Sequence, residues 1–178
     1  MSLFDRERLA QLFAGHDAIV NLASVLPATR DFAKYGAWAE NIRIRTEGSA
    51  TVVGAAFEAG VPRLVQESAC MIYRDHGAEW IDEDRPTDVF SKARSNHAAE
   101  ASARRFADAG GAVVLLRFGW FYGPGAKHSE EFLALARRRG LCIMMGAPNT
   151  YVSSIHVADG GRSSPLSPRR RDIQRRRR

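Results

Sequence analysis

Short apolar runs alternate with long helical stretches along this chain, and that alternation constrains the fold more than any other feature. Residues 18–23 and 112–118 are such runs, 63–66 is the strand expected between them, and helical stretches at 32–59 and 89–109 separate the three. Runs that are apolar at nearly every position are typical of strands covered on both faces, as parallel strands are. Strand–helix–strand order implies βαβ units with right-handed crossovers. The sequence therefore predicts an α/β fold with a parallel sheet across 18–118.

Helix boundaries are marked by polar caps and by glycine. Ser2 or Asp5 can cap a first helix that ends near residue 14, before Gly15. The long helix 32–59 ends before Gly60 and Pro62. Its expected inward stripe is Trp38, Ile42, Arg45, Ser49, Val52, Ala56 and Ala59. Further elements are expected as an irregular loop at 69–86, a helix at 129–139 and weaker strands at 142–145 and 152–157.

Ligands of open parallel α/β sheets bind outside the carboxyl ends of the strands. In this chain those ends are followed by residues 21–29, 68–86 and 119–128. Candidate functional side chains are therefore sought in these three stretches.

The net charge of +6 comes from the C-terminal segment of the chain. Residues 161–178 hold eight arginines and one aspartate, a net of +7, which leaves −1 for residues 1–160. We expect a folded domain over 1–160 and a disordered Arg-rich tail over 161–178. A folded part without basic excess does not favour nucleic-acid binding. No apolar run approaches the roughly 18 residues of a membrane span, so a cytoplasmic protein without membrane partners is predicted.

Several kinds of catalytic site are disfavoured by spacing. The two cysteines, Cys70 and Cys142, lie 72 residues apart and are expected to be buried apolar side chains. The five histidines show no metal-binding spacing, so no metal site is predicted. Ser68 lies at a strand end, but its surroundings do not match the GxSxG pattern of a hydrolase nucleophile.

Four segments, in matching order and spacing, resemble one known family. They are GHDAIVNLAS (15–24), ENIRIRTEGSATVVGAAFEAGVPRLVQES (40–68), LLRFGWFYGPG (115–125) and YVSSIHVADG (151–160). The family is the NAD-dependent epimerase/dehydratase branch of the extended short-chain dehydrogenase/reductases. The resemblance runs from about residue 3 to Asp159.

The resemblance implies a partial Rossmann-like, doubly wound parallel sheet that lacks its first strands. It also implies NAD or NADP as cofactor and a small-molecule substrate with a carbonyl or hydroxyl group, such as a nucleotide sugar. Helices 33–60 and 89–109 resemble the family's dimerising pair, so a homodimer is implied as well.

The same resemblance assigns residues to the cofactor. It places Leu22, Ala23 and Ser24 along the cofactor with Asn41 near them, and Gly119 and Trp120 beside the nicotinamide. Structural roles compete with these assignments. Leu22 and Ala23 have the composition of any buried strand end, and Asn41 can simply tie a loop to a helix.

The chain departs from the family at the acid–base residues. The family uses Ser or Thr, Tyr and Lys, in which the tyrosine exchanges a proton with the substrate oxygen. The matching positions here hold Ala69, Lys92 and Asn96, and a shifted register gives FxxxR at 90–94. Ser68, one residue before the Ser/Thr position, is the candidate catalytic residue.

Both ends of the chain also depart from the family. No glycine-rich pyrophosphate-binding turn opens the sequence, and a substrate-binding helix is replaced after Asp159 by GGRSSPLSPRRRDIQRRRR. We interpret the chain as a fragment in which strand 18–23 presents an apolar edge.

Three functions remain open at this point. One is an atypical epimerase/dehydratase-type oxidoreductase with weak or no activity, which binds dinucleotide more than tenfold less tightly (~1.4 kcal/mol) than a full-length relative. Another is a non-catalytic nucleotide-sensing or interaction protein of the same fold. The last is an inert fragment.

Overall fold

The computed structural model describes residues 2–140 and 150–162. The chain divides into two compact units. The first unit contains residues 1–74 and 85–117, and the second contains 75–84 and 118–178.

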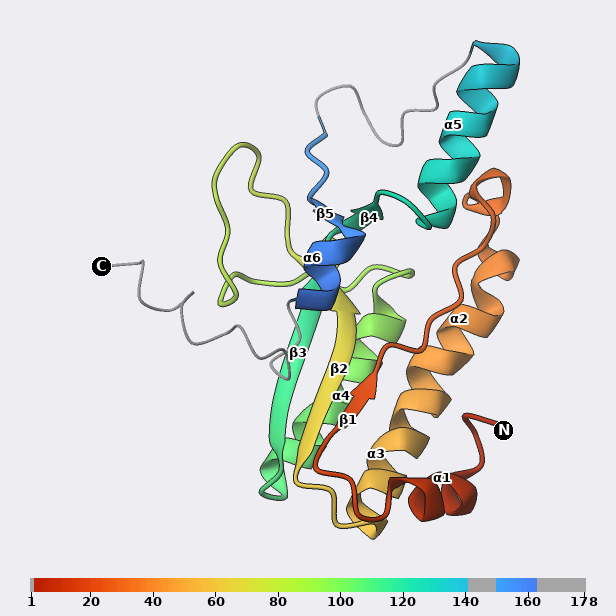
Figure 1. Ribbon diagram of the computed structural model, residues 1–178. Coiled ribbons are helices and arrows are strands. Elements are labelled where there is room, and N and C mark those ends of the chain that lie inside the picture. The colour runs from red at the N-terminus through yellow and green to blue at the C-terminus, as the bar shows by residue number, and fades with distance from the viewer. Residues whose placement is uncertain (1, 141–149, 163–178) are drawn as a thin grey trace. The chain divides into compact units, whose positions relative to one another are not determined.

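The first unit is built on a three-stranded sheet in the order β1–β2–β3 (Figure 1). The strands are β1 (Ile19–Asn21), β2 (Arg63–Ala69) and β3 (Ala112–Phe118). β1 and β2 are parallel, with Ile19 opposite Leu64 and Asn21 opposite Gln66. The predicted α/β fold with a parallel, Rossmann-like sheet is confirmed.

The first helix, α1 (Arg6–Phe13), begins where the sequence predicts. The Asp5 side chain caps it by accepting a hydrogen bond from the Arg8 backbone N–H at 3.0 Å. Leu9 is the buried residue of this helix and joins the core of the first unit.

The predicted helix 32–59 is a series of shorter elements rather than one α-helix. It comprises η1 (Thr29–Asp31), η2 (Tyr35–Trp38), α2 (Ala39–Arg43), a π-helical turn η3 (Ile44–Gly48) and α3 (Ser49–Glu58). The start is delayed because residues 32–38 pack locally. The Trp38 indole N–H donates to the Phe32 carbonyl at 3.0 Å, and the two rings meet edge to face at 4.8 Å. Most of the expected inward stripe, including Arg45, is buried.

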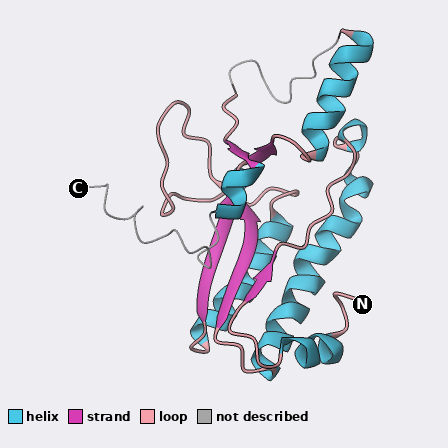
Figure 2. Cartoon of the chain, viewed as in Figure 1, coloured by secondary structure: helices cyan, strands magenta, loops and turns pink. Residues whose placement is uncertain are grey.

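Helix α4 (Arg94–Asp108) connects β2 to β3, and the short 3-10 turn η4 (Cys70–Ile72) follows β2. Helices α3 and α4 pack against each other as well as against the sheet, so both cover the same face (Figures 1 and 2). Consecutive right-handed crossovers that add strands in one direction produce this arrangement. The core between them contains Val52, Ala56, Leu64, Ala103 and Phe106.

Helix α4 begins five residues later than the predicted start at 89. The segment before it is held by contacts to the loop after β2. The Asp88 N–H donates to the Ile72 carbonyl at 2.8 Å, and Arg74 forms an ion pair with Asp88 at 3.0 Å. These interactions hold the chain in a loop before Arg94.

Strand β1 is an edge strand among the described residues, because it pairs with β2 alone. Its apolar side chains remain accessible, with Val20 40% exposed and the following Leu22 53% exposed. This agrees with the expected apolar edge at 18–23.

The second unit contains β4 (Trp120–Tyr122), which pairs in parallel with β5 (Ser154–His156). Helix α5 (Lys127–Arg139) follows β4, and α6 (Val157–Arg162) follows β5. The weak strand prediction at 152–157 is thus confirmed at its centre. The expected strand at 142–145 and Cys142 lie outside the described residues, while Cys70 is half-buried instead of buried.

No helix in the described ranges is both long and apolar enough to cross a lipid bilayer. Helix α6 extends to Arg162, so the predicted domain boundary at 160/161 falls inside it. Residues 163–178 of the expected tail lie outside the described residues.

Candidate functional site

The carboxyl ends of β1 and β2 carry a group of polar side chains in the first unit. At the end of β1, the Asn21 side-chain amide donates to the Gln66 side-chain oxygen at 2.9 Å. The Ala23 N–H donates to the Asn21 side-chain oxygen at 3.3 Å. These bonds fix the backbone that leaves β1 and turn Leu22 toward solvent, where it is 53% exposed.

Ser24 connects this strand end to the crossover helix. Its Oγ accepts hydrogen bonds from Asn41 Nδ2 at 3.1 Å and from Arg45 Nη2 at 3.3 Å. Asn41 and Arg45 are themselves buried, whereas Ser24 is exposed. The structure thus brings together four of the residues assigned to the cofactor: Leu22, Ala23, Ser24 and Asn41.

Arg45, which donates to Ser24, is also part of a buried ion pair. Arg45 Nη2 lies 2.6 Å from Glu67 Oε1, and these side chains are 7% and 14% exposed. Burial raises the pKa of Glu67, and the charge and hydrogen bond of Arg45 offset part of that rise. Arg45 Nε and Glu67 Oε2 are buried without hydrogen-bond partners among the described residues.

Sequence reasoning did not assign Arg45 or Glu67 to the site. The signal was present in the expected inward stripe of helix 32–59, where Arg45 is the one charged member. A charged side chain on a buried face requires a partner, because an unpaired buried charge is very costly. The partner could not be named from sequence, since Glu67 lies 22 residues away.

A second buried network surrounds Glu100, whose side chain is fully buried. Ser68 Oγ donates to Glu100 Oε1 at 2.7 Å. Arg117 binds both carboxylate oxygens at 2.8 Å, and Arg104 donates to Oε2 at 2.8 Å. The Arg117 guanidinium also lies over the Tyr73 ring, 4.8 Å from its centroid.

The hydrogen bonds and charges of this network favour the ionised form of Glu100. Burial acts to raise the pKa of Glu100, but the hydrogen bonds from Arg117 and Ser68 and the charges of Arg117 and Arg104 outweigh it and lower that pKa. The Glu100 carboxylate in turn raises the pKa of Arg117. Glu100 is therefore a stable anion at neutral pH, and its network joins β2, α4 and β3. In sequence reasoning Glu100 was not considered a site residue.

Ser68, the candidate catalytic residue, lies inside that network. It is completely buried, and its hydroxyl proton is engaged by Glu100. Its catalytic role stays a prediction, and such a role would require the hydroxyl to leave Glu100 or to act through it.

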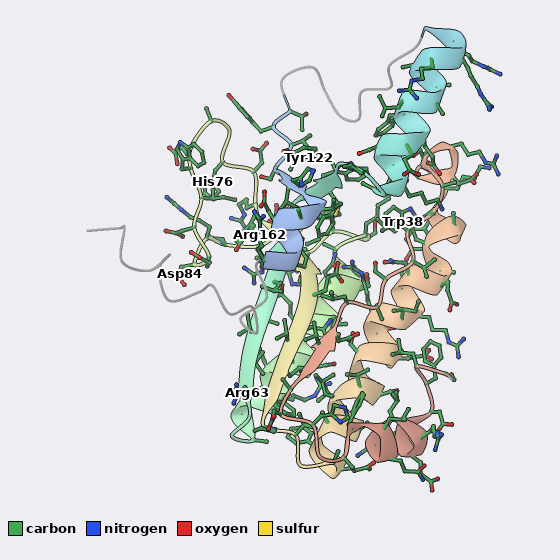
Figure 3. The ribbon with its side chains drawn as sticks, viewed as in Figure 1. Trp38, Arg63, His76, Asp84, Tyr122 and Arg162 are labelled. Atoms are coloured by element: carbon green, nitrogen blue, oxygen red, sulfur yellow. The ribbon has the colours of Figure 1, made fainter. Side chains whose placement is uncertain are left out.

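The positions matching the family's tyrosine and lysine also lie in the first unit. Lys92 Nζ donates to the Phe32 carbonyl at 3.1 Å and lies 5.4 Å from the Trp38 ring centroid. Asn96 is buried in the first turn of α4, and its Oδ1 has no hydrogen-bond partner among the described residues. Figure 3 shows Trp38 toward the carboxyl ends of the strands of the first unit and Arg63 at the opposite end of the sheet.

Gly119 and Trp120 belong to the second unit. A Cβ at Gly119 would lie 2.8 Å from the Ser153 carbonyl oxygen, so close packing against that backbone explains the glycine. The Trp120 N–H donates to the same oxygen at 2.7 Å, and its ring lies 5.0 Å from the ring of His128. Their assignment to the nicotinamide stays a prediction.

The described part of the first unit therefore offers a specific surface. The apolar Leu22 and the hydroxyl-bearing Ser24, two residues apart, are both exposed at the carboxyl end of a parallel strand. The charge behind them is internally neutralised by the Arg45–Glu67 pair. In 2–140 and 150–162, no three His, Cys, Asp or Glu side chains gather as a metal site.

Comparisons with known proteins identify the family of this chain. Residues 1–160 match the NAD dependent epimerase/dehydratase family. A similar protein is 3-diazoavenalumate denitrifying reductase from a Streptomyces species, 33% identical over 133 residues, which are 71% of this chain and 43% of that protein.

Solved structures of similar fold carry NAD. The dTDP-glucose 4,6-dehydratase DesIV from Streptomyces venezuelae, with NAD and TYD bound, has a TM-score of 0.77 and 25% identity over 91% of this chain and 51% of that chain. The Bordetella bronchiseptica enzyme WbmG, in complex with NAD and UDP, has a TM-score of 0.68 and 25% identity over 94% of this chain and 52% of that chain.

The chain spans about half the length of these solved relatives and less than half of the reductase. Its match to the family nevertheless covers most of its own residues, in agreement with the four resembling segments. The chain belongs to the NAD-dependent epimerase/dehydratase family.

Proposed function

We propose that this chain is the dinucleotide- and substrate-facing part of an NAD(P)-dependent oxidoreductase of the epimerase/dehydratase type. The observation that carries the proposal is the exposed Leu22–Ala23–Ser24 segment, fixed by Asn21, Asn41 and Arg45 at the carboxyl end of β1. Ligands of parallel α/β sheets bind at this position. The similar solved structures with NAD bound support the same cofactor here.

The residues present fit part of a dinucleotide. Leu22 supplies an apolar surface for a ring, and Ser24 supplies a hydroxyl to a polar group of the cofactor. Gly119 and Trp120 would face the nicotinamide. The bound cofactor would give a hydride to the substrate or accept one from it.

We further propose a substrate with a carbonyl or hydroxyl group, and a nucleotide sugar is the first class to test. WbmG was crystallised with UDP, and DesIV is named a dTDP-glucose 4,6-dehydratase. A similar protein is named a 3-diazoavenalumate denitrifying reductase and not a sugar-modifying enzyme, so a non-sugar carbonyl compound is the second class to test.

Weak or absent turnover is part of the proposal. At the positions that match the family's proton-transferring pair, Lys92 donates to a backbone carbonyl and Asn96 has no ionisable group. In their place Ser68, bound to the Glu100 anion, is the hydroxyl closest in sequence to the family's Ser/Thr position. A nucleotide-sensing or interaction protein without catalysis is the alternative that the same two residues favour.

Three further assignments complete the proposal. Residues 1–160 form an incomplete Rossmann-like domain with residues 161–178 as a disordered tail, a homodimer forms through α3 and α4, and the protein is cytoplasmic. Analytical ultracentrifugation of the full chain tests the dimer, which a single monomer mass at 100 μM would contradict.

Titration of the full chain with NADH and NADPH, followed by fluorescence, tests the function. Binding with substrate turnover supports the oxidoreductase, and binding without turnover supports the sensing protein. Leu22→Asp should abolish binding, whereas Leu12→Asp, at a similarly exposed leucine of α1, should leave it intact. Equal binding by both variants, or none by the unmodified chain, would contradict the proposed site.

A further inference from the structure

The two hydrogen bonds to Ser24 determine the direction of its hydroxyl proton. A serine hydroxyl has two acceptor lone pairs and one proton. Asn41 Nδ2 and Arg45 Nη2 can only donate, and both donate to Ser24 Oγ, at 3.1 and 3.3 Å. With both lone pairs engaged, the proton of Ser24 is the one hydrogen-bonding function left to it, and it is directed away from both donors.

We propose that Asn41 and Arg45 are positioning residues that hold Ser24 as a fixed hydrogen-bond donor to an uncharged oxygen of the bound dinucleotide. This inference rests on the proposed function and changes the part played by Asn41. Asn41 acts through Ser24 and does not contact the cofactor itself, in agreement with its 3% exposure.

The buried ion pair accounts for the precision of this arrangement. Arg45 lies in the π-helical turn 44–48, and the same Nη2 atom that binds Glu67 at 2.6 Å also reaches Ser24. π-turns within α-helices occur frequently at functional sites. Since the pair leaves Arg45 Nε and Glu67 Oε2 without partners, it is a weak source of stability. What the pair does provide is a fixed position for Arg45 Nη2, which orients the Ser24 hydroxyl.

The charge balance indicates the kind of acceptor. Glu67 neutralises Arg45 at 2.6 Å, so the pair presents no net positive charge at Ser24. A phosphate would be favoured by unneutralised cations. A ribose hydroxyl, a carboxamide oxygen or another uncharged oxygen needs only a neutral donor, which Ser24 provides.

Asn41→Asp is the decisive variant because it keeps the shape of the side chain and reverses its hydrogen bonding. The aspartate accepts the Ser24 proton, so the donor turns inward and is lost to the ligand. Ser24→Ala removes the same donor directly. The neighbouring Glu40→Gln, exposed on the same helix, is the matched control.

The experiment uses the full chain in ¹⁵N–¹H NMR, which also measures millimolar dissociation constants. Without ligand, Ser24→Ala should shift the Asn41 side-chain amide signals, and Glu40→Gln should not. With NADH, Ser24→Ala and Asn41→Asp should each raise Kd about fivefold to tenfold, the size of one neutral hydrogen bond. The double variant should be no weaker than Ser24→Ala alone.

The outcomes separate this inference from the proposed function. If the unmodified chain binds neither NADH nor NADPH up to 10 mM, the proposed function fails and the inference fails with it. If it binds but Asn41→Asp binds equally well, or the two losses multiply in the double variant, only the inference is overturned. Unshifted Asn41 signals in Ser24→Ala also overturn it. The loss in Ser24→Ala should be the same at 50 and 500 mM NaCl, and a loss that shrinks with salt indicates a charged acceptor and overturns that assignment.

Discussion

Replacement of Glu100 by glutamine should destabilise the chain more than any exposed charge replacement. The substitution keeps the shape and an acceptor oxygen, but it removes the negative charge that faces Arg117 at 2.8 Å. Arg117 is 15% exposed, so it would remain a largely buried cation that no longer faces the negative charge of Glu100. Loss of one partner from a buried pair costs about 3–5 kcal/mol.

That loss is large on the scale of folding. A typical domain has a free energy of unfolding of about 5–15 kcal/mol, so Glu100→Gln should remove a major fraction of the stability. Glu58→Gln is the matched control, because Glu58 pairs with Arg6 at 2.7 Å and both side chains are about half exposed. An exposed pair of this kind contributes about 0–1 kcal/mol.

Urea unfolding followed by circular dichroism measures the difference. We expect the midpoint of Glu100→Gln to fall clearly below that of Glu58→Gln, with unchanged slopes. The double variant Glu100→Gln with Arg117→Met should recover part of the loss, because it also removes the buried cation that faced Glu100. Equal midpoints for the two single variants would refute the assignment of Glu100 as a buried, charge-paired anion.

The pH dependence of stability, compared between the unmodified chain and Glu100→Gln, provides an internal check. The pKa of Glu100 is lowered in the folded state, so its stabilising contribution is complete above the unfolded pKa of about 4.3 and is lost as pH falls through the folded pKa. The stability gap between the unmodified chain and Glu100→Gln should be constant from pH 7 to pH 5 and should narrow below pH 4. A gap that widens on acidification would contradict the lowered pKa.

Two further substitutions test other parts of the first unit by the same unfolding assay. Arg45→Met should lower the free energy of unfolding by about 3–5 kcal/mol, because it leaves Glu67 buried without its cation. Arg45→Met combined with Glu67→Leu should be neutral or stabilising, because it removes two buried atoms without partners. A double variant as unstable as Arg45→Met would contradict this prediction. Gly111→Ala would place a Cβ against the Phe106 ring in the core and should lower the free energy of unfolding by about 1–3 kcal/mol. Gly36→Ala, with open space around it, should change stability by less than about 0.5 kcal/mol. Equal effects of the two variants would show that the Phe106 ring moves aside at little cost.

The order of strands and helices could be predicted because it depends on local patterns. The apolar runs around Val20, Leu64 and Leu115 identify three strands, and the helical stretches between them identify crossovers. The π-turn could not be predicted. Arg45 within it contacts Ser24 and Glu67, 21 and 22 residues away, and such long-range contacts leave no trace in a local period.

Only part of the candidate site could be named from the sequence. Motif resemblance singled out Ser24 and Asn41, and the structure brings them within hydrogen-bond distance. Resemblance could not single out Glu67 or Glu100 as partners, because motif matching compares residues with a family and not with one another. A buried charge is found from sequence only when it falls on an apolar stripe, as Arg45 does.

The two residues that donate hydrogen bonds to Ser24 both lie in one segment of the chain. Asn41 and Arg45 belong to the crossover that links β1 to β2, so the exposed Ser24 hydroxyl is held by residues 17 and 21 positions further along the chain. Any local opening of residues 39–48 would release both donors from Ser24, so hydrogen-exchange protection in this segment should follow the fraction of molecules competent for ligand. A compound that rigidifies this crossover would then tighten dinucleotide binding without touching the dinucleotide.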